Sequence, residues 1–325
     1  MSTVAAGNYT IPLFVPSLPT ASELAPYFDA IDTSRRYTNF GGNVVALERE
    51  MLDYPDRTSR NPHGKVTDVV TAANGTLALV VALRALQLPR GTRVLIPAYT
   101  FVATAAAVIE AGLTPLLSDI DPASWQLTPE IAEETLNRIP FGVAMPVAPY
   151  GYPIDLGKWE AFEYSTNVPV VVDAAAAFGN RVVGAVEAVI FSLHATKILP
   201  AAEGGLLCMR DGAKATPARR LTNFGLNGLV LTDIGTNAKM SEYHAAIARC
   251  QLARLPEIIA DRLDVYRRYV EALTCIRDRA RLVEPGTAIP SVAALVCADS
   301  DTRDRVESAL RTNGVETRRG YQSPH

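Results

Sequence analysis

From about residue 67 the sequence alternates short apolar runs with stretches of helical spacing, and this alternation limits the fold more than any other feature. The apolar runs are nearly continuous in valine, isoleucine and leucine, which is typical of a mainly parallel sheet covered by helices on both faces. The sequence therefore predicts a three-layer α/β fold. The runs that we interpret as strands are VTDVVTAA, TRVLIPA, TPLLSDI, VAMPVA, NVPVVVDA, VEAVIFSL and GGLLCMR, and the helical stretches among them are GTLALVVALRAL, TFVATAAAVIEAG and PEIAEETLNRI.

The pattern changes near residue 240. A long run at helical spacing begins there, and we expect Pro256 to break it. Shorter elements follow, SVAALVC as a strand and SDTRDRVESALRTNG as a helix. We therefore expect a large domain over residues 1–240 and a small C-terminal α+β domain over residues 241–325.

Composition excludes several classes of protein. Of the 325 residues, 48% are hydrophobic and 20% are charged, the formal net charge is −3, and like charges form no block. This balance predicts no nucleic-acid partner, and no apolar run approaches the roughly 20 residues that span a bilayer. The start of the chain lacks the features of a signal peptide, and the four cysteines and four histidines show no metal-ligand spacing. We expect a cytoplasmic protein with reduced thiols, no metal and no membrane association.

Ligands of open α/β sheets bind at the carboxyl ends of the strands, so the residues that follow each predicted strand are the first candidates for a site. Four polar or aromatic groups are found there and should meet at one edge of the sheet. They are Asn74-Gly75-Thr76, Tyr99-Thr100-Phe101, Asp173 with the alanines at 174–177, and His194 with Lys197.

Three of these groups have both a structural and a functional interpretation. Gly75 and Thr76 open a helix, where free N–H groups bind phosphate, although Asn and Thr also favour plain helix caps. Asp173 ends a buried strand and can pair with the protonated ring nitrogen of a pyridine cofactor, or it can cap the alanine-rich segment. Phe101 can stack on a planar ring or pack in the core.

Lys197 is the sharpest signal in the sequence. Lysine occurs at only five positions, 65, 158, 197, 214 and 239, and only Lys197 follows a buried strand at the same edge as Asp173 and Gly75. A desolvated lysine has a lowered pKa and becomes a nucleophile toward aldehydes, whereas a lone lysine is usually a surface residue. Ser192, just before it, can add a phosphate contact. Together these groups occur in the chain order that a pyridoxal-phosphate enzyme needs.

At this point several stretches resemble, in the right order, the motifs of the DegT/DnrJ/EryC1/StrS family of sugar aminotransferases. FSLHATKILPAAEGG is similar to FSFHxTKxxxxGEGG, and VVVDAAAAFGN to the DxAxxxG strand end. The likeness covers nearly the whole chain and implies the three-layer architecture of fold-type-I pyridoxal-phosphate-dependent transferases. The other similar stretches are RRYTNFGGNVVALEREM (TNxGP…LE), AANGTLALVVALRALQLPRGTRVLIPAYTFVATAAAVIEAGLTPLLSDIDP (SGTxAL…GDEV…P…TFxAT…G…P…DxD) and TNAKMSEYHAAIARCQLARL (NxRMSExxAAxxxxQLxxL).

The resemblance implies a role for each matching residue. Lys197 would bond covalently to pyridoxal 5′-phosphate and then move the proton between the two reacting carbons, and Asp173 would bind the pyridine nitrogen. Asn237 would reach the cofactor phosphate of a neighbouring subunit, so that a homodimer with shared active sites is expected. The remaining roles are a ring stacker at Phe101, phosphate ligands at Gly75, Thr76 and Ser192, and a turn that shapes the site at Glu203, Gly204 and Gly205.

The chain also departs from the family pattern. Ala176 stands where a glutamine usually lies near the phenolic oxygen of the cofactor. The chain stops at GYQSPH, where relatives continue, and we interpret the small domain as shortened. The other departures are Phe178 for histidine, Ala202 for glycine, Lys239 for arginine and Gly42 for proline.

The resulting expectation is an aminotransferase that moves an amino group from an amino acid, with glutamate as the expected donor, to a keto group of a nucleotide-linked deoxysugar. A sugar dehydratase of the same family is an alternative, but in those relatives histidine replaces the lysine. A cofactor-binding regulatory or sensor protein without turnover stays open because of Ala176 and the end of the chain. A nicotinamide oxidoreductase is disfavoured because no GxGxxG follows the first strand of the alternating region.

Overall fold

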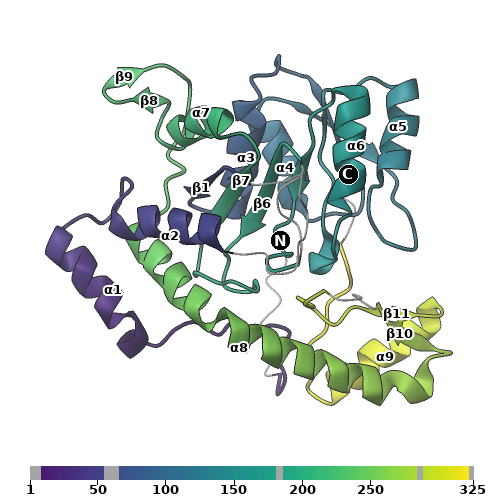
Figure 1. The fold of residues 1–325 in the computed structure, drawn as a ribbon. Helices are drawn as coiled ribbons and strands as arrows, with labels where there is room; N and C mark the ends of the chain where they lie inside the picture. The colour runs from purple at the N-terminus through teal and green to yellow at the C-terminus, as the bar shows by residue number, and fades with distance from the viewer. Residues whose placement is uncertain (1–8, 55–65, 181–185, 284–287, 322–325) are drawn as a thin grey trace.

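The computed structural model describes residues 9–54, 66–180, 186–283 and 288–321 (Figure 1). The predicted order of strands and helices is present. In chain order the elements are α1 (Ala21–Ser34), α2 (Gly42–Asp53), β1 (Asp68–Ala72), α3 (Gly75–Ala85), β2 (Arg93–Pro97), α4 (Val102–Glu110), β3 (Thr114–Ser118), α5 (Pro129–Arg138), β4 (Val143–Ala144), η1 (Pro149–Gly151), α6 (Leu156–Thr166), β5 (Val171–Asp173), β6 (Ala188–Ser192), β7 (Gly205–Met209), α7 (Gly212–Thr222), β8 (Leu226–Asn227), β9 (Val230–Leu231), α8 (Glu242–Leu273), η2 (Thr274–Ile276), β10 (Ala280–Leu282), β11 (Leu295–Cys297) and α9 (Ser300–Thr312).

The central sheet is mainly parallel, as the sequence predicts. Its strands lie in the order β3-β2-β4-β5-β6-β7-β1, and parallel bridges from Ala144 to Val170 and from Val147 to Asp173 join the two halves. β7 runs antiparallel to both of its neighbours, β6 and β1. The other strands therefore all point the same way, and their carboxyl ends share one edge.

Two hydrophobic layers cover the two faces of this sheet. Successive strand residues alternate between them: Val69 and Val189 face the layer formed with α2, α5, α6 and α8, whereas Val70 and Ile190 face the layer formed with α3, α4 and α7. Because both faces are buried, the strands need apolar residues at every position, which explains their continuous apolar sequences. The three-layer α/β architecture of a fold-type-I transferase is thus confirmed.

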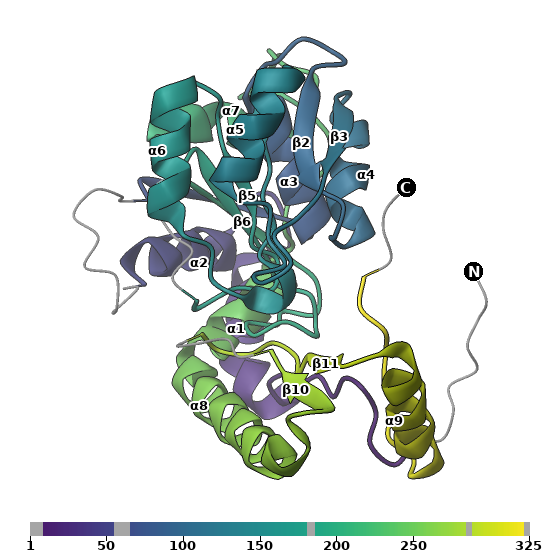
Figure 2. The same ribbon diagram turned by 90° about the vertical axis from the view of Figure 1, so that its right-hand side faces the viewer.

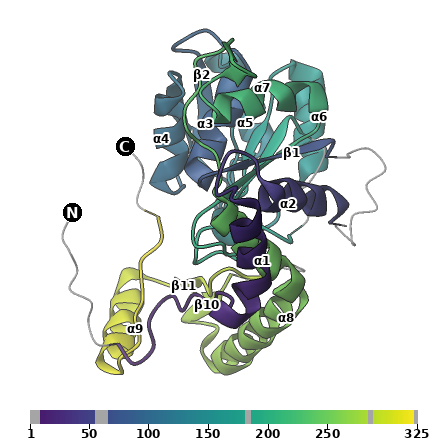
Figure 3. The same ribbon diagram turned by 90° about the vertical axis from the view of Figure 1, so that its left-hand side faces the viewer.

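The expectation that Pro256 breaks the long helix is wrong. α8 runs without interruption from Glu242 to Leu273 with Pro256 inside it. Pro256 is exposed, so water can solvate the carbonyl that a proline leaves without an intrahelical donor. Packing against α1 and α2 before the proline, and against β10 after it, also holds the two parts in line (Figures 1 and 3).

β10 and β11 lie beside the second half of α8, and α9 lies on the far side of this strand pair, all three apart from the central sheet (Figure 2). β10 and β11 form their own antiparallel pair. The boundary of a small domain at residue 240 stays a prediction, since α8 contacts both parts of the molecule.

Candidate active site

Asp173 and Lys197 lie at the same edge of the sheet. Asp173 ends β5, and Lys197 follows its parallel neighbour β6. The Asp173 side chain is buried, and this burial raises the pKa of its carboxyl, while a hydrogen bond from Thr104 and the charge of Lys197 act in the other direction. Burial lowers the pKa of the Lys197 amine, and the charge of Asp173 partly opposes that shift. The site therefore holds an amine that loses its proton more readily than an ordinary lysine, close to a buried acid.

Gly75 and Ser192 form a narrow cradle next to this pair. Gly75 is the first residue of α3, and a Cβ atom placed on it would lie 2.9 Å from the Cβ of Ser192. On the other side, a Cβ on Gly205 would lie 2.4 Å from the carbonyl oxygen of Asn74. Only glycine fits at either position. The first N–H groups of α3, with the hydroxyls of Thr76 and Ser192 beside them, provide the donors that a phosphate group requires.

Phe101 and Ala176 flank the acid. Phe101 is the N-cap of α4 and is 59% exposed, so its ring is open to a partner and does not pack in the core. Ala176 lies in the turn after Asp173, and its carbonyl oxygen would be 2.4 Å from a Cβ on Gly151, whose φ is +85°. Close backbone packing thus fixes the turn that carries Asp173 and Ala176.

Asn237 is not brought together with these residues. It is exposed at the base of the β8–β9 hairpin, where its backbone pairs with Asn223. The carbonyl of the next residue, Ala238, accepts a 2.7 Å hydrogen bond from Ala73 at the end of β1. The segment that carries Asn237 is therefore attached to the sheet where β1 ends, but Asn237 itself is exposed to solvent.

The turn after β6 brings a histidine and a glutamate close together. Glu203 lies 3.8 Å from Nε2 of His194, and both side chains are about half exposed. Ala202 has φ +65°, in the left-handed region that glycine adopts without strain. This backbone conformation explains why the family pattern has glycine at the position of Ala202.

The surroundings of Phe178 and Lys239 suit those side chains, whereas nothing in the described residues explains the glycine at position 42. Phe178 is buried and makes an edge-to-face contact with Phe191, with ring centroids 5.4 Å apart, so it belongs to the core. Lys239 lies over the ring of Phe224 at 4.5 Å, where a cation–π contact forms. Gly42 is the first residue of α2, and open space surrounds the position of its missing Cβ.

Tyr99, which the sequence placed at this edge with Phe101, belongs to an aromatic cluster whose other members, Trp125, Tyr150 and Tyr321, sequence reasoning missed. The hydroxyls of Tyr99 and Tyr150 lie 2.7 Å apart, and Tyr321 stacks on Tyr150 with ring centroids 4.9 Å apart and an angle of 8°. The ring of Trp125 contacts Tyr99 and Tyr150. Tyr99 closely follows β2, so the rule about strand ends identifies it, whereas Tyr150 lies in η1, beyond the end of β4 at Ala144. We call Tyr99, Trp125, Tyr150 and Tyr321 the aromatic rim.

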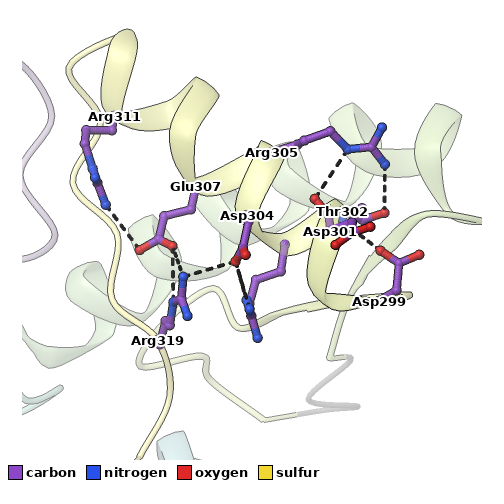
Figure 4. Close-up of polar contacts among 9 residues, drawn as sticks. Asp299, Asp301, Thr302, Asp304, Arg305, Glu307, Arg311 and Arg319 are labelled. Carbon is purple, nitrogen blue, oxygen red and sulfur yellow. Dashed lines mark hydrogen bonds and ion pairs between the residues drawn. The ribbon is translucent and has the colours of Figure 1, made fainter.

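Tyr321 reaches this rim from the far part of the chain. After α9 the chain runs back toward the central sheet (Figures 2 and 3). Arg319 anchors this segment on α9 through ion pairs with Glu307 at 2.7 Å and Asp304 at 3.1 Å (Figure 4). The next residue, Gly320, lies against the hydroxyls of Tyr99 and Tyr150, which a Cβ would meet at 2.5 and 2.7 Å.

These residues fit pyridoxal phosphate. The cradle at Gly75 and Ser192 suits its phosphate, the buried Asp173 suits its ring nitrogen, and the Lys197 amine suits its aldehyde. Elsewhere in the described residues, no group of three or more His, Cys, Asp or Glu side chains could hold a metal ion. None of the helices in these same ranges is long and apolar enough to cross a membrane.

Comparison with known proteins identifies the family. Residues 20–325 match the model of the DegT/DnrJ/EryC1/StrS aminotransferase family, and the chain belongs to this family. It is 34% identical to protein Rv3402c of Mycobacterium tuberculosis over 97% of this chain and 77% of that protein. It is 30% identical to a dTDP-4-amino-4,6-dideoxy-D-glucose transaminase of Shigella dysenteriae over 95% of this chain and 84% of the relative.

Solved structures show the same fold. A putative PLP-dependent aminotransferase from Bacillus cereus superposes with a TM-score of 0.85 and 27% identity, covering 95% of this chain and 85% of the other. DesI, solved in the presence of its TDP-sugar product, gives a TM-score of 0.83 and 27% identity, covering 96% and 80%. The prediction of a pyridoxal-phosphate-dependent aminotransferase is thereby confirmed at the level of family and fold.

Proposed function

We propose that this protein is a cytoplasmic, homodimeric aminotransferase that moves an amino group from an amino acid, with glutamate as the expected donor, to a keto group of a nucleotide-linked deoxysugar. The observation that carries the proposal is the placement of the Lys197 amine and the buried Asp173 carboxylate at one sheet edge, next to the cradle of Gly75 and Ser192. The cytoplasmic location rests on the sequence alone.

The residues of this site have distinct tasks in the proposal. Gly75, Thr76 and Ser192 hold the phosphate of pyridoxal phosphate, Phe101 stacks on its ring, and Asp173 binds its ring nitrogen. Ala176, if placed beside the phenolic oxygen of the cofactor, would offer it no side-chain hydrogen bond. When bound, the cofactor supplies an electron sink that lets the amino group leave one carbon and join another.

Lys197 moves the proton that this exchange requires. A proton acceptor must be neutral when the proton arrives, and burial of Lys197 favours its neutral form because it lowers the pKa of the amine. Asp173 stays close enough to oppose part of that shift. The same amine would therefore take the proton from the α-carbon of the amino-acid donor in the first half-reaction and supply a proton to the sugar carbon in the second, with the bound cofactor keeping the proton in between.

The aromatic rim supports a substrate with flat apolar faces. Aromatic rings stack on nucleobases and on other flat apolar faces. Tyr321 joins the rest of the aromatic rim to Phe101, because its ring contacts those of Tyr99, Tyr150 and Phe101. The names of the transaminase of Shigella dysenteriae and of DesI refer to dTDP- and TDP-linked sugars. We extend this substrate class to the present chain.

An exposed apolar hairpin supports the homodimer. Leu229 at its tip is fully exposed, and Val230, Leu231 and Ile234 are 64%, 66% and 90% exposed. The hairpin of β8 and β9 projects from the body of the molecule (Figure 1). Exposed apolar groups of this kind mark interaction surfaces. In the proposed dimer the hairpin packs on a second copy and Asn237, at its base, reaches the partner's cofactor phosphate.

The test uses the purified protein loaded with pyridoxal phosphate. It is mixed first with glutamate and then with a set of TDP- and UDP-linked keto-deoxysugars. Mass spectrometry then measures the masses of the sugar products. Amination replaces the keto oxygen with an amino group, whereas a dehydratase removes water, so the two product masses differ. Loss of the cofactor's visible band with glutamate, followed by an aminated sugar, is the expected result. No change of the band with any common amino acid overturns the proposal.

Lys197→Ala is the matched control, since it removes the amine and leaves the phosphate cradle intact.

The dimer is tested separately by light scattering of the wild-type protein and of a Leu229→Asp/Leu231→Asp variant. A wild-type protein that is monomeric at micromolar concentration contradicts the dimer.

A further inference from the structure

Two buried hydroxyls lie behind Asp173, one on the first turn of α4 and one just before the N-cap of that helix. The Thr104 hydroxyl donates a 2.7 Å hydrogen bond to Oδ2 of Asp173, and the hydroxyl oxygen of Thr100 lies 2.7 Å from that of Thr104. Thr100 is 1% exposed and Thr104 is fully buried. Threonine carries a single hydroxyl hydrogen, so the direction of each bond in this chain of contacts can be worked out.

Both hydroxyl hydrogens point toward the acid. An ionised carboxylate only accepts, so the hydrogen of Thr104 is committed to Asp173. The 2.7 Å contact between the two threonines then requires Thr100 to donate to Thr104, in preference to the carbonyl oxygen of Phe101, which lies 3.4 Å from the Thr100 hydroxyl. Threonine inside a helix commonly bonds the carbonyl four residues earlier, but Thr104 bonds across to β5 instead. The arrangement is therefore specific to the carboxylate and does not serve the helix.

The second oxygen of Asp173 is also held. Oδ1 accepts a 3.1 Å hydrogen bond from the backbone N–H of Ala175. Both oxygens thus have one protein donor and keep further acceptor capacity for a ligand. Burial raises the pKa of Asp173 and would favour its neutral form, and the Thr104 hydrogen bond is the largest influence in the opposite direction. A neutral acid could not pair with a protonated ring nitrogen in the same way.

We propose that Thr104, fixed by Thr100, is a positioning residue that keeps Asp173 ionised and oriented toward the ring nitrogen of pyridoxal phosphate. This inference rests on the proposed function. It also gives a task to the two threonines of the TFVAT stretch, in which Phe101 was the one residue with a predicted role. Phe101 and Thr104 lie one turn apart on α4, so the same helix start sets the position of the stacking ring and that of the carboxylate.

The test measures binding of two cofactors to the apoprotein. One is pyridoxal phosphate, and the other is its analogue with carbon in place of the ring nitrogen. Thr104→Val should weaken binding of pyridoxal phosphate roughly ten- to a hundredfold, the range for a hydrogen bond to a charged group. Binding of the carbon analogue should be unchanged by Thr104→Val, because that ligand makes no bond from a ring nitrogen to Asp173. Thr104→Ser should restore binding of pyridoxal phosphate to within about threefold of wild type.

The control variant is Thr222→Val. Thr222 is also fully buried, and its hydroxyl donates to the carbonyl of Arg219 within the last turn of α7. It should leave the affinity for both cofactors unchanged. Circular dichroism checks that each variant is folded. If Thr104→Val does not fold, the test uses cofactor binding by Thr104→Ser alone.

Two outcomes overturn the inference. Equal weakening of both cofactors by Thr104→Val means that the residue is merely structural, and undiminished binding of pyridoxal phosphate means that Asp173 does not depend on it. If Thr104→Ser is the only folded variant, a more than tenfold loss of pyridoxal phosphate binding contradicts the assigned role of the hydroxyl. A wild-type protein that binds no pyridoxal phosphate overturns the proposed function itself, so the two failures can be told apart.

Discussion

The carboxylate of Glu242 accepts a 2.6 Å hydrogen bond from the backbone N–H of Asn43, although 199 residues separate them. The other carboxylate oxygen accepts from the N–H of Val44 at 3.2 Å. The N-cap of α2 is Gly41, which makes no side-chain cap hydrogen bond, and a Cβ on Gly41 would lie 2.6 Å from the Glu242 carboxyl carbon. Glu242 therefore caps α2 from α8, and the motifs TNFGGN and MSE form one structural unit.

Removal of this cap should destabilise the protein. Glu242 is 1% exposed, so Glu242→Ala leaves two N–H groups of α2 without their acceptor in a dry site. We expect a loss of about 3 kcal/mol in the free energy of unfolding, the upper value for a hydrogen bond to a charged group. Urea unfolding measures it. Glu257→Ala, an exposed position on the same helix, should change stability by less than about 0.5 kcal/mol. Equal stability of the two variants would contradict the capping role.

Ala202→Gly should stabilise the protein. Ala202 has φ +65°, a conformation that costs an L-residue roughly 1–2 kcal/mol and costs glycine nothing. Glycine has more conformational entropy in the unfolded chain, which offsets part of this effect. We therefore expect a net gain of about 0.5–1 kcal/mol in the free energy of unfolding. The control is Ala195→Gly in the same turn, whose N–H donates to the carbonyl of Ala202 and whose φ is not positive. Ala195→Gly should lose stability by a similar amount, as measured by thermal unfolding. A lower stability of the Ala202→Gly variant would show that the backbone at Ala202 is not strained.

The strand ends were predictable from the sequence and the contacts behind them were not. Asp173, Lys197 and Gly75 all follow apolar runs, so the rule that ligands bind at strand ends placed them at one edge. Thr104 lies inside a helical pattern, where a threonine gives no sign of the strand it faces. Tyr321 comes from the other end of the chain, and no period or motif brings it to Tyr150. The continuity of α8 could not be predicted for the same reason. It depends on packing against distant segments on both sides of Pro256, which outweighs the tendency of proline to break a helix.

Capture of pyridoxal phosphate by Lys197 should begin at lower pH than capture by an ordinary lysine. Only the neutral amine attacks an aldehyde, and burial lowers the pKa of Lys197. Borohydride trapping across a pH series, followed by peptide mapping, measures the midpoint, with the exposed Lys158 as the internal control. In Asp173→Asn the charge that raises the Lys197 pKa is gone, so the midpoint should move to still lower pH. Coincident midpoints for Lys197 and Lys158 would show that Lys197 is not desolvated.

The same shift predicts how stability of the apoprotein depends on pH. Between the lowered pKa of Lys197 and its unfolded value of about 10.4, the unfolded chain binds more protons than the folded chain. Stability contributed by this residue therefore rises with pH through that window. Lys197→Met should flatten that rise in a series of unfolding experiments from pH 7 to 10. An unaltered slope would mean that Lys197 titrates as it does in the unfolded chain.

Tyr321→Ala should impair the sugar half-reaction and spare the amino-acid half-reaction. Tyr321 stacks on Tyr150 and its ring lies 6.4 Å from that of Phe101, so it forms part of the wall next to the proposed cofactor ring. Aromatic contacts of this kind are worth about 0.5–1.5 kcal/mol, which corresponds to a rise in KM for the nucleotide sugar of roughly two- to tenfold. Stopped-flow measurement of each half-reaction separates the two substrates.

The matched control for this variant is Tyr164→Ala. Tyr164 is 90% exposed on α6, and its removal should leave both half-reactions unchanged. Equal impairment of both half-reactions by Tyr321→Ala would mean that Tyr321 supports the cofactor itself and not the sugar. A faster sugar half-reaction would mean that Tyr321 stands in the path of the substrate, because then its stack on Tyr150 must open before the sugar can bind.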